Sequence, residues 1–204
     1  MYIRAQHRNP EFTEALEFIG NQAFGILIAQ LNKRSWGTHL PFIVNKDLSI
    51  SSHMAKANPL AHQWLNEGLP EEVLCIFKGA GAYISGSWYT HEEVSTYNYT
   101  ALHVYCTVNL CSPEQTLSDL ETLMHTHESR QKNPKFMSDY SSETLKQARG
   151  VLGFNLEVRE FHFAQKLSQE RKTDRDQVIA HLKEGNFNEQ AVAAAMQDQN
   201  NKPV

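Results

Sequence analysis

The chain has 204 residues, of which 41% are hydrophobic and 21% are charged, and its formal net charge is −4. This composition is typical of a globular protein with one substantial core. There is no run of about 18 apolar residues and no apolar stretch at the N-terminus, so we expect a cytoplasmic protein without a membrane span. The negative net charge gives no general attraction for nucleic acid, and no basic patch stands out. The three cysteines, Cys75, Cys106 and Cys111, lack CxxC spacing and are expected to be reduced, partly buried thiols.

Hydrophobic periodicity and turn residues divide the N-terminal half into short strands with two helices. Apolar residues after Pro10 predict an amphipathic helix at about 12–19, and Pro59 predicts a short helix over 59–67. The turn-like segment 32–35 joins the first two predicted strands into a hairpin. Strands are predicted over 24–31, 36–44, 48–53, 73–77, 82–85 and 98–110.

The C-terminal half contains one long strand and several helices. A strand over 151–163 changes the phase of its alternation near Arg159 and Glu160, which predicts a bulge there. Pro113 opens a helix with three-four apolar spacing. The helices are predicted over 113–126, 173–184 and 188–197, with a polar loop over 128–139 and a break at Gly185.

Six or seven strands with few helices between them favour an antiparallel barrel or sandwich, so the predicted fold class is mainly β (α+β). We predict a barrel domain over 1–170, C-terminal helices packed on it over 171–198, and a frayed tail over 199–204. The second C-terminal helix carries no Lys or Arg, so we interpret the pair as packing helices and not as a DNA-binding helix-turn-helix.

The start of the 59–67 helix is the most informative local feature. Asn58 is a suitable N-cap, Pro59 suits the first helical position, and Gly68 follows the expected end. A helix N-terminus beside Lys56 is a natural position for a phosphate group. An ordinary strand-to-helix junction would show the same pattern.

Two strands carry residues that suit a binding surface. Odd positions of the 98–110 strand, among them Tyr99 and His103, form a face that either lines a site or packs beneath a helix. The strand over 36–44 contains Gly37 and Pro41, which indicates either an edge strand or a wall for a flat ligand.

Other motifs give weaker signals. The glycine-rich and aromatic segment 77–89 resembles either a binding loop or a surface loop, and it has no phosphate-loop pattern. His125 and His127 are two apart on a helix and make a poor metal pair, so no metal site is predicted. No nucleophile in a catalytic arrangement is recognisable, and no catalytic residue is assigned.

Five blocks, taken together and in order, resemble the PaiB family of FMN-binding negative transcriptional regulators. They are 38–41 (Thr-His-Leu-Pro), 53–59 (His-Met-Ala-Lys-Ala-Asn-Pro), 82–89 (Ala-Tyr-Ile-Ser-Gly-Ser-Trp-Tyr), 98–105 (Asn-Tyr-Thr-Ala-Leu-His-Val-Tyr) and 166–169 (Lys-Leu-Ser-Gln). The resemblance covers about 1–181. It implies a split β-barrel homodimer related to the pyridoxamine-phosphate oxidases, with FMN bound between the subunits.

FMN has a dianionic phosphate and a flat, mostly apolar ring, so its site needs cations and N–H donors at one end and apolar walls at the other. For the phosphate we expect His53, Lys56 and Asn58, and for the ring Trp36, Thr38, His39 and Leu40. The resemblance adds residues near the C-terminus that reach the flavin across the dimer, namely Lys166, Ser168, Gln169 and Arg171, and the strand face adds Tyr99 and His103.

The sequence departs from the family pattern at several positions. The family commonly has proline where Ala80, Gly86 and Ser95 stand, tryptophan at Tyr97 and asparagine at Glu170. The loss of prolines leaves the segment 79–96 less rigid, and the additional carboxylate weakens local anion binding.

Two alternative functions stay open at this level. A bound flavin supplies redox chemistry, so a flavin-dependent oxidoreductase is the first alternative. The second is a haem-binding split barrel, with His39 or His103 as axial ligand.

Overall fold

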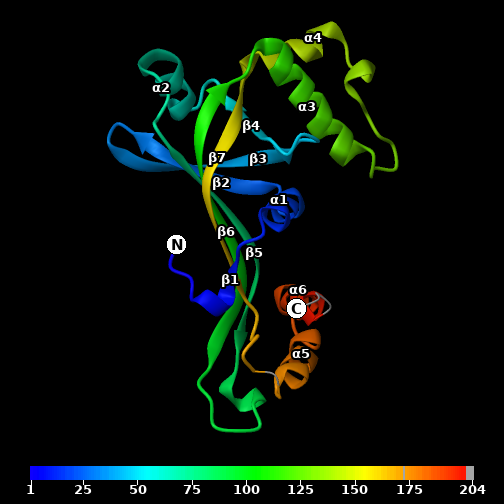
Figure 1. Cartoon of the computed structure of the whole chain (residues 1–204). Coiled ribbons are helices and arrows are strands. Elements are labelled where there is room, and N and C mark those ends of the chain that lie inside the picture. Colours follow the sequence, from blue (N-terminus) through cyan, green and yellow to red (C-terminus); the bar gives the residue numbers. More distant parts are fainter. Residues whose placement is uncertain (172, 201–204) are drawn as a thin grey trace. The chain divides into compact units, whose positions relative to one another are not determined.

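The computed structural model describes residues 1–171 and 173–200 (Figure 1). In these residues, seven strands form one sheet in the order β1-β7-β4-β3-β2-β5-β6, and a further pairing of β7 with β6 closes it. The strands are β1 (Arg8–Asn9), β2 (Phe24–Leu31), β3 (Arg34–Val44), β4 (Ile50–Ala55), β5 (Val73–Ile84), β6 (Thr96–Leu110) and β7 (Val151–Lys166). This confirms the predicted mainly β (α+β) split-barrel class.

The α-helices flank these strands in the chain. They are α1 (Phe12–Asn21), α2 (Pro59–Glu67), α3 (Pro113–Glu128), α4 (Ser142–Leu145), α5 (Arg175–Lys183) and α6 (Phe187–Asn200). Short 3-10 turns occupy Ala5–His7, Gly86–Trp88, Met137–Asp139 and Lys146–Gly150. None of the helices in the described part of the chain has the length and apolar character needed to cross a bilayer.

Contacts within the chain group its residues into two compact units. The first comprises 1–11, 78–103 and 162–204, and the second comprises 12–77 and 104–161. These units combine separate segments of the sequence and do not test the predicted domain boundary at residue 170, which remains a prediction. Of the predicted frayed tail, 201–204 lies outside the described residues, whereas α6 extends as far as Asn200.

The β2–β3 hairpin has the two-residue turn that its sequence favours. Asn32 and Lys33 both have positive φ, 51° and 63°, as a type I′ turn requires. Antiparallel pairing then runs from Leu31 opposite Arg34 to Phe24 opposite Pro41. The predicted hairpin is confirmed, but β3 begins two residues earlier than predicted because the turn is shorter.

Other strand predictions also differ from the structure. The predicted strands over 73–77 and 82–85 are one continuous strand, β5, because Gly79 and Gly81 stay in extended backbone. Strand β4 begins at Ile50, since Leu48 has a φ of 66° and belongs to a turn. Strand β7 runs through the predicted bulge region, although its burial changes phase there as expected. The short helix α4 and the strand β1 were not predicted.

The second unit has an aromatic core inside the barrel. Phe42 and Phe77 meet edge to face with ring centroids 4.8 Å apart. Trp64 of α2 contacts Phe154 of β7 in the same way at 5.3 Å. All four side chains are buried, and edge-to-face packing of this kind adds to the stabilisation from burial.

The first unit has its own core, in which α5 and α6 take part. Val178 and Leu182 of α5 and Val192 and Met196 of α6 pack with Ile84 at the end of β5. The two helices also contact one another, as Figure 1 shows. Burial of these faces is what the interpretation of α5 and α6 as packing helices requires.

Gly153 gives a test of the packing of α3 on β7. A Cβ atom at Gly153 would lie 2.4 Å from Oγ1 of Thr116, so Gly153→Ala should force α3 to shift and lower the free energy of unfolding by about 1–3 kcal/mol. Gly150→Ala is the matched control, because nothing lies within 4 Å of its added Cβ. Equilibrium urea unfolding measures the free energy of unfolding of both variants. Thr116→Ala, added to the Gly153→Ala variant, should restore part of the lost stability. An equal effect of the two glycine substitutions would contradict this packing.

Candidate functional site

The first cluster of candidate residues lies in the second unit, where β4 leads into α2. The Asn58 side chain accepts a hydrogen bond from the backbone N–H of Leu60 at 3.0 Å, and Pro59 occupies the first helical position. Gly68 ends the helix with a φ of 108°. The predicted helix bounds and cap are therefore confirmed, and the cap holds the first turn of α2 in place.

Asn58 also connects α2 to β3. Its Nδ2 donates to Oγ1 of Thr38 at 3.4 Å, and Nε1 of Trp36 donates to the same hydroxyl at 3.2 Å. Trp36 and Thr38 are two residues apart on β3, so their side chains lie on the same face of the strand. The structure thus brings Trp36, Thr38 and Asn58 together.

Lys56 supplies a cation beside the helix start. Its Nζ donates to the backbone oxygen of Arg149 at 2.7 Å, and the side chain is exposed. A cavity of about 320 Å³ has Lys56, Pro59, His62 and Glu67 among its lining residues. The cap and Pro59 leave few N–H groups of the first turn free, so the helix dipole and the lysine are what favour an anion here.

The candidates on β3 are divided between its two faces. His39 pairs with Ile26 of β2 and stacks with Phe24 at a ring separation of 6.1 Å, so it lies on the face opposite to Trp36 and Thr38. Leu40 shares the face of Thr38 but is buried in the core. Gly37 and Pro41 predicted either an edge strand or a wall for a flat ligand. Residues 34–41 of β3 pair with β2, and only 42–44 pair with β4, and a Cβ added at Gly37 would meet Ile26 at 3.5 Å.

His53 lies beneath α3. It is half-buried, between the buried residues Ser52 and Met54 of β4, which point to the other strand face. Burial lowers the pKa of its imidazole, and the nearby carboxylate of Asp119 partly opposes this. Asp119 also lies 4.0 Å from Sγ of Cys111, whose pKa is raised chiefly by burial.

The second cluster lies in the first unit and surrounds a cavity of about 340 Å³. Four of the candidates, Tyr99, Lys166, Ser168 and Arg171, line it. Lys166 donates to the hydroxyl of Thr96, and Nη2 of Arg171 lies 2.5 Å from Oε2 of Glu93. Burial, with a further contribution from Arg4, lowers the pKa of Lys166.

Ser168 lines this cavity, whereas Gln169 is not among its lining residues. Ser168 has a φ of 57°, and its hydroxyl and the Asn98 amide form two hydrogen bonds, at 2.9 and 3.2 Å. Gln169 accepts from the backbone N–H of Leu167 at 2.8 Å and donates to the backbone oxygen of Gln165. These contacts hold a non-glycine residue in the left-handed region, a conformation concentrated at functional sites.

His103 is separate from this group. It is half-buried, and burial is the main cause that lowers its pKa, followed by the N-terminal amine and His162. His103 is not among the described residues that line the cavity.

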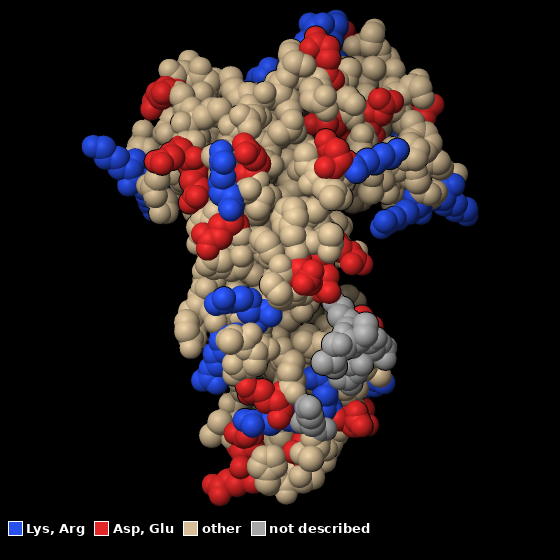
Figure 2. Space-filling view, in the orientation of Figure 1, with Lys and Arg blue, Asp and Glu red and all other residues tan. Residues whose placement is uncertain are grey.

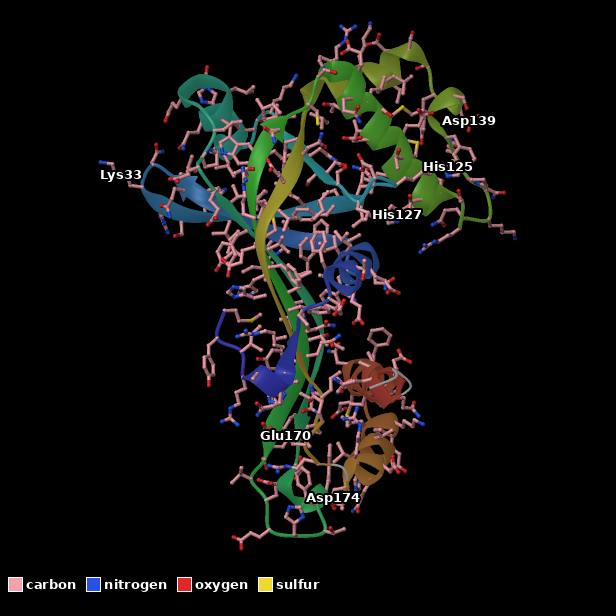
Figure 3. All side chains as sticks on the ribbon, in the orientation of Figure 1. Lys33, His125, His127, Asp139, Glu170 and Asp174 are labelled. Carbon is pink, nitrogen blue, oxygen red and sulfur yellow. The ribbon has the colours of Figure 1, made fainter. Side chains whose placement is uncertain are left out.

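Sequence reasoning missed the cavity residues that come from the N-terminus and from the loop before β6. They include Arg4, His7 and Glu93. Glu170, an exposed departure from the family pattern that Figure 3 labels, also lines the cavity. His7 is only 8% exposed, and its Nδ1 has no hydrogen-bond partner among the described residues. No local pattern in the sequence joins residues 4 and 7 to residues 166–171, so only the fold identifies them.

The two histidines of α3 belong to no cluster of three or more metal-ligating side chains in the described part of the chain. Figure 3 shows His125 and His127 on this helix, and His125 is occupied by a hydrogen bond to the Ser129 hydroxyl at 3.2 Å. Over residues 1–171 and 173–200, no group of three or more His, Cys, Asp or Glu could hold a metal ion.

Comparisons with known proteins agree with this geometry. The family model described as "Putative FMN-binding domain" matches residues 1–160. The protease synthase and sporulation protein PAI 2 of Bacillus subtilis (strain 168) is 32% identical over 210 residues, and the match covers all of both chains.

Solved structures match the fold at low sequence identity. The FAD and haem binding protein from Mycobacterium smegmatis is 12% identical with a TM-score of 0.59, covering 78% of this chain and 73% of that one. The flavocytochrome Anf3 from Azotobacter vinelandii is 12% identical with a TM-score of 0.58, covering 80% and 72%. At this identity, the likeness concerns the fold alone.

Barrel topology and the family match define the class as flavin-binding split-barrel proteins. Within that class, the chain belongs to the FMN-binding PaiB family, and FMN is its cofactor.

Proposed function

We propose that this protein is a PaiB-type regulator that holds FMN with its phosphate at the β4–α2 junction. The observation that carries the proposal is the hydrogen bond of Asn58 with Thr38 at the start of α2, two residues after Lys56, which lines a cavity with Pro59. A lysine, an amide and a hydroxyl are donors that a phosphate dianion accepts from, so the residues present fit this part of the cofactor. His53 is the fourth candidate for this end.

The flavin ring needs a wall that is flat and largely apolar. Strand β3 offers two such surfaces, with Trp36 on one face and Gly37 and His39 on the other. Gly37 has no side chain of its own, and an added Cβ would meet Ile26 at 3.5 Å, so a ring could approach the backbone at this position. When bound, FMN supplies one- and two-electron redox chemistry, while these residues orient it and exclude water.

A second copy of the chain is proposed to pack on the outer face of the barrel. Ile26 and Ile28 of β2 pair with Ile76 and Leu74 of β5, and all four side chains are only partly buried. Phe24 on the same face is 69% exposed. A continuous apolar face in the middle of a sheet is a typical interface, and it would bring a second subunit close to Gly37 and His39.

The regulatory role is proposed without direct DNA contact by α6. This helix has no Lys or Arg, and Figure 2 shows Lys and Arg interspersed with Asp and Glu on the face in view. A recognition helix without a cation lacks the usual phosphate anchors. A cytoplasmic location follows from the regulatory role and remains a prediction.

Lys56 gives the direct test of the phosphate position. Lys56→Gln should weaken FMN binding about tenfold, since it removes a charge-assisted hydrogen bond. Titration of flavin fluorescence measures the affinity, and Lys46→Gln, an exposed charge in the 45–49 turn, is the control. Equal affinities in the two variants would contradict the phosphate position.

The same sample separates the alternatives. Bleaching of the bound flavin by NADH or NADPH would favour the oxidoreductase, and a sharp haem absorption band after reconstitution with haem would favour the haem-binding protein.

Phe24 tests the dimer. The wild-type chain should sediment as a dimer, and Phe24→Lys should raise the dimer dissociation constant at least tenfold, because the introduced charge would lose its water in the interface. Phe187→Lys is the control, because Phe187 is 85% exposed on α6 and lies outside this face. Analytical ultracentrifugation reads the mass. A monomeric wild type, or an unchanged Phe24→Lys dimer, would contradict the interface.

Direct DNA binding has a clear negative expectation. The FMN-loaded protein should give no retarded band with duplex DNA in a gel-shift assay at raised salt, since α6 carries no Lys or Arg to neutralise phosphates. Retardation that survives raised salt would show that DNA is contacted directly, and this part of the proposal would then be wrong.

A further inference from the structure

The cavity of the first unit is lined by more cationic side chains than carboxylates. Arg4, Lys166 and Arg171 line it together with Glu93 and Glu170. Arg171 is paired with Glu93, and Glu170 accepts a hydrogen bond from Gln6. Lys166 has the Thr96 hydroxyl as its partner, and among the described residues the Arg4 guanidinium has none.

The two carboxylates of the lining offset the repulsion among its three cations only in part. Lys166 loses hydration on burial and is repelled by Arg4 and Arg171, and both effects lower its pKa, whereas Glu170 opposes them. Oxyanions bind such groups through charge-assisted hydrogen bonds, which are shorter and stronger than neutral ones. A bound oxyanion would thus stabilise the charged state of Lys166.

The remaining lining is aromatic and polar. Tyr89 is buried and Tyr99 half-buried, and both face the cavity from different elements. The buried His7 ring also lines the cavity, and its Nδ1 has no hydrogen-bond partner among the described residues. The volume of about 340 Å³ is at the small end of the range for ligand sites.

We propose that this cavity binds a small aromatic oxyanion, a phosphate monoester or a carboxylate, as a second ligand besides FMN. Arg4 and Lys166 hold the anionic group, and Tyr89 and Tyr99 contact the ring. The inference deepens the proposed function and depends on its assignment of FMN to the β4–α2 junction. It reassigns Lys166, Ser168 and Arg171 from the flavin to this second ligand.

Calorimetric titration of the FMN-loaded full chain tests the proposal. Phenyl phosphate and benzoate are the phosphate and carboxylate probes, and phenol is the neutral control. We expect at least one anion to bind, phenol to bind at least tenfold more weakly, and the flavin absorption to show that FMN stays bound.

Arg4→Gln and Arg8→Gln form a matched pair for the same titration. Both are exposed arginines of the N-terminal segment, but Arg8 does not line the cavity. Arg4→Gln should weaken anion binding about tenfold, and Arg8→Gln should leave it unchanged. Lys166→Gln should act in the same direction as Arg4→Gln.

Three results would overturn the inference. They are the absence of binding by either anion, equal affinities in the two arginine variants, and release of FMN by phenyl phosphate, which would make this cavity the flavin site itself. If the wild type fails to bind FMN at Lys56, the proposed function fails instead, and titration of the flavin-free chain still decides whether the cavity takes an anion.

Discussion

The pairing register of β2 with β3 is the constraint on which the candidate flavin site depends. Side chains alternate between strand faces with a period of two, so a slip of one residue would exchange the positions of Thr38 and His39. The two-residue turn at Asn32 and Lys33 fixes this register, because both residues adopt the positive φ that the turn demands. The hydrogen bond of Thr38 with Asn58 is possible only in this register.

The constraint explains why one short motif serves two surfaces. In the block over 38–41, Thr38 points toward α2 and His39 toward the outer face of the barrel. A ligand that touches both must reach around the edge of β3, or the second surface must be completed by another subunit. The partly buried isoleucines beside His39 favour the second explanation, since an apolar face is stabilised by burial.

Local signals were sufficient for some of this site and not for the rest. The bounds of helix α2 follow from Asn58, Pro59 and Gly68, three residues whose conformational preferences act within one turn. Strand β5 was divided in the prediction because Gly79 and Gly81 weaken a strand pattern, whereas pairing with neighbouring strands overrides that preference. The contribution of Arg4 and His7 to a cavity formed with residues 166–171 is non-local, and no spacing rule reports it.

The division of β3 candidates shows the same limit in finer detail. A list of neighbours in sequence predicted Trp36, Thr38, His39 and Leu40 as one wall. Alternation alone separates His39 from the others, but the burial of Leu40 follows from packing against the barrel core, which the sequence does not specify residue by residue.

The C-terminal helices acquire a role from two adjacent residues at the start of α5. Asp174 is fully buried and accepts from the backbone N–H of Thr90 at 2.9 Å and from its hydroxyl at 2.6 Å, bonds that lower the pKa of the carboxyl. Arg175 donates to the backbone oxygens of Leu167 at 2.7 Å and Met196 at 2.6 Å. Asp174 thus holds the loop that carries Glu93, and Arg175 holds the turn that carries Ser168.

Both walls of the cavity in the first unit are held by the same helix start, where Figure 3 labels Asp174. Buried charged groups are costly unless fully hydrogen-bonded, and Nε of Arg175 has no partner among the described residues. The hydrogen bonds of Asp174 and Arg175 therefore offset this cost only in part, and what they contribute is rigidity of the cavity. Through these hydrogen bonds, the helical pair at the C-terminus holds two segments that line the cavity of the first unit.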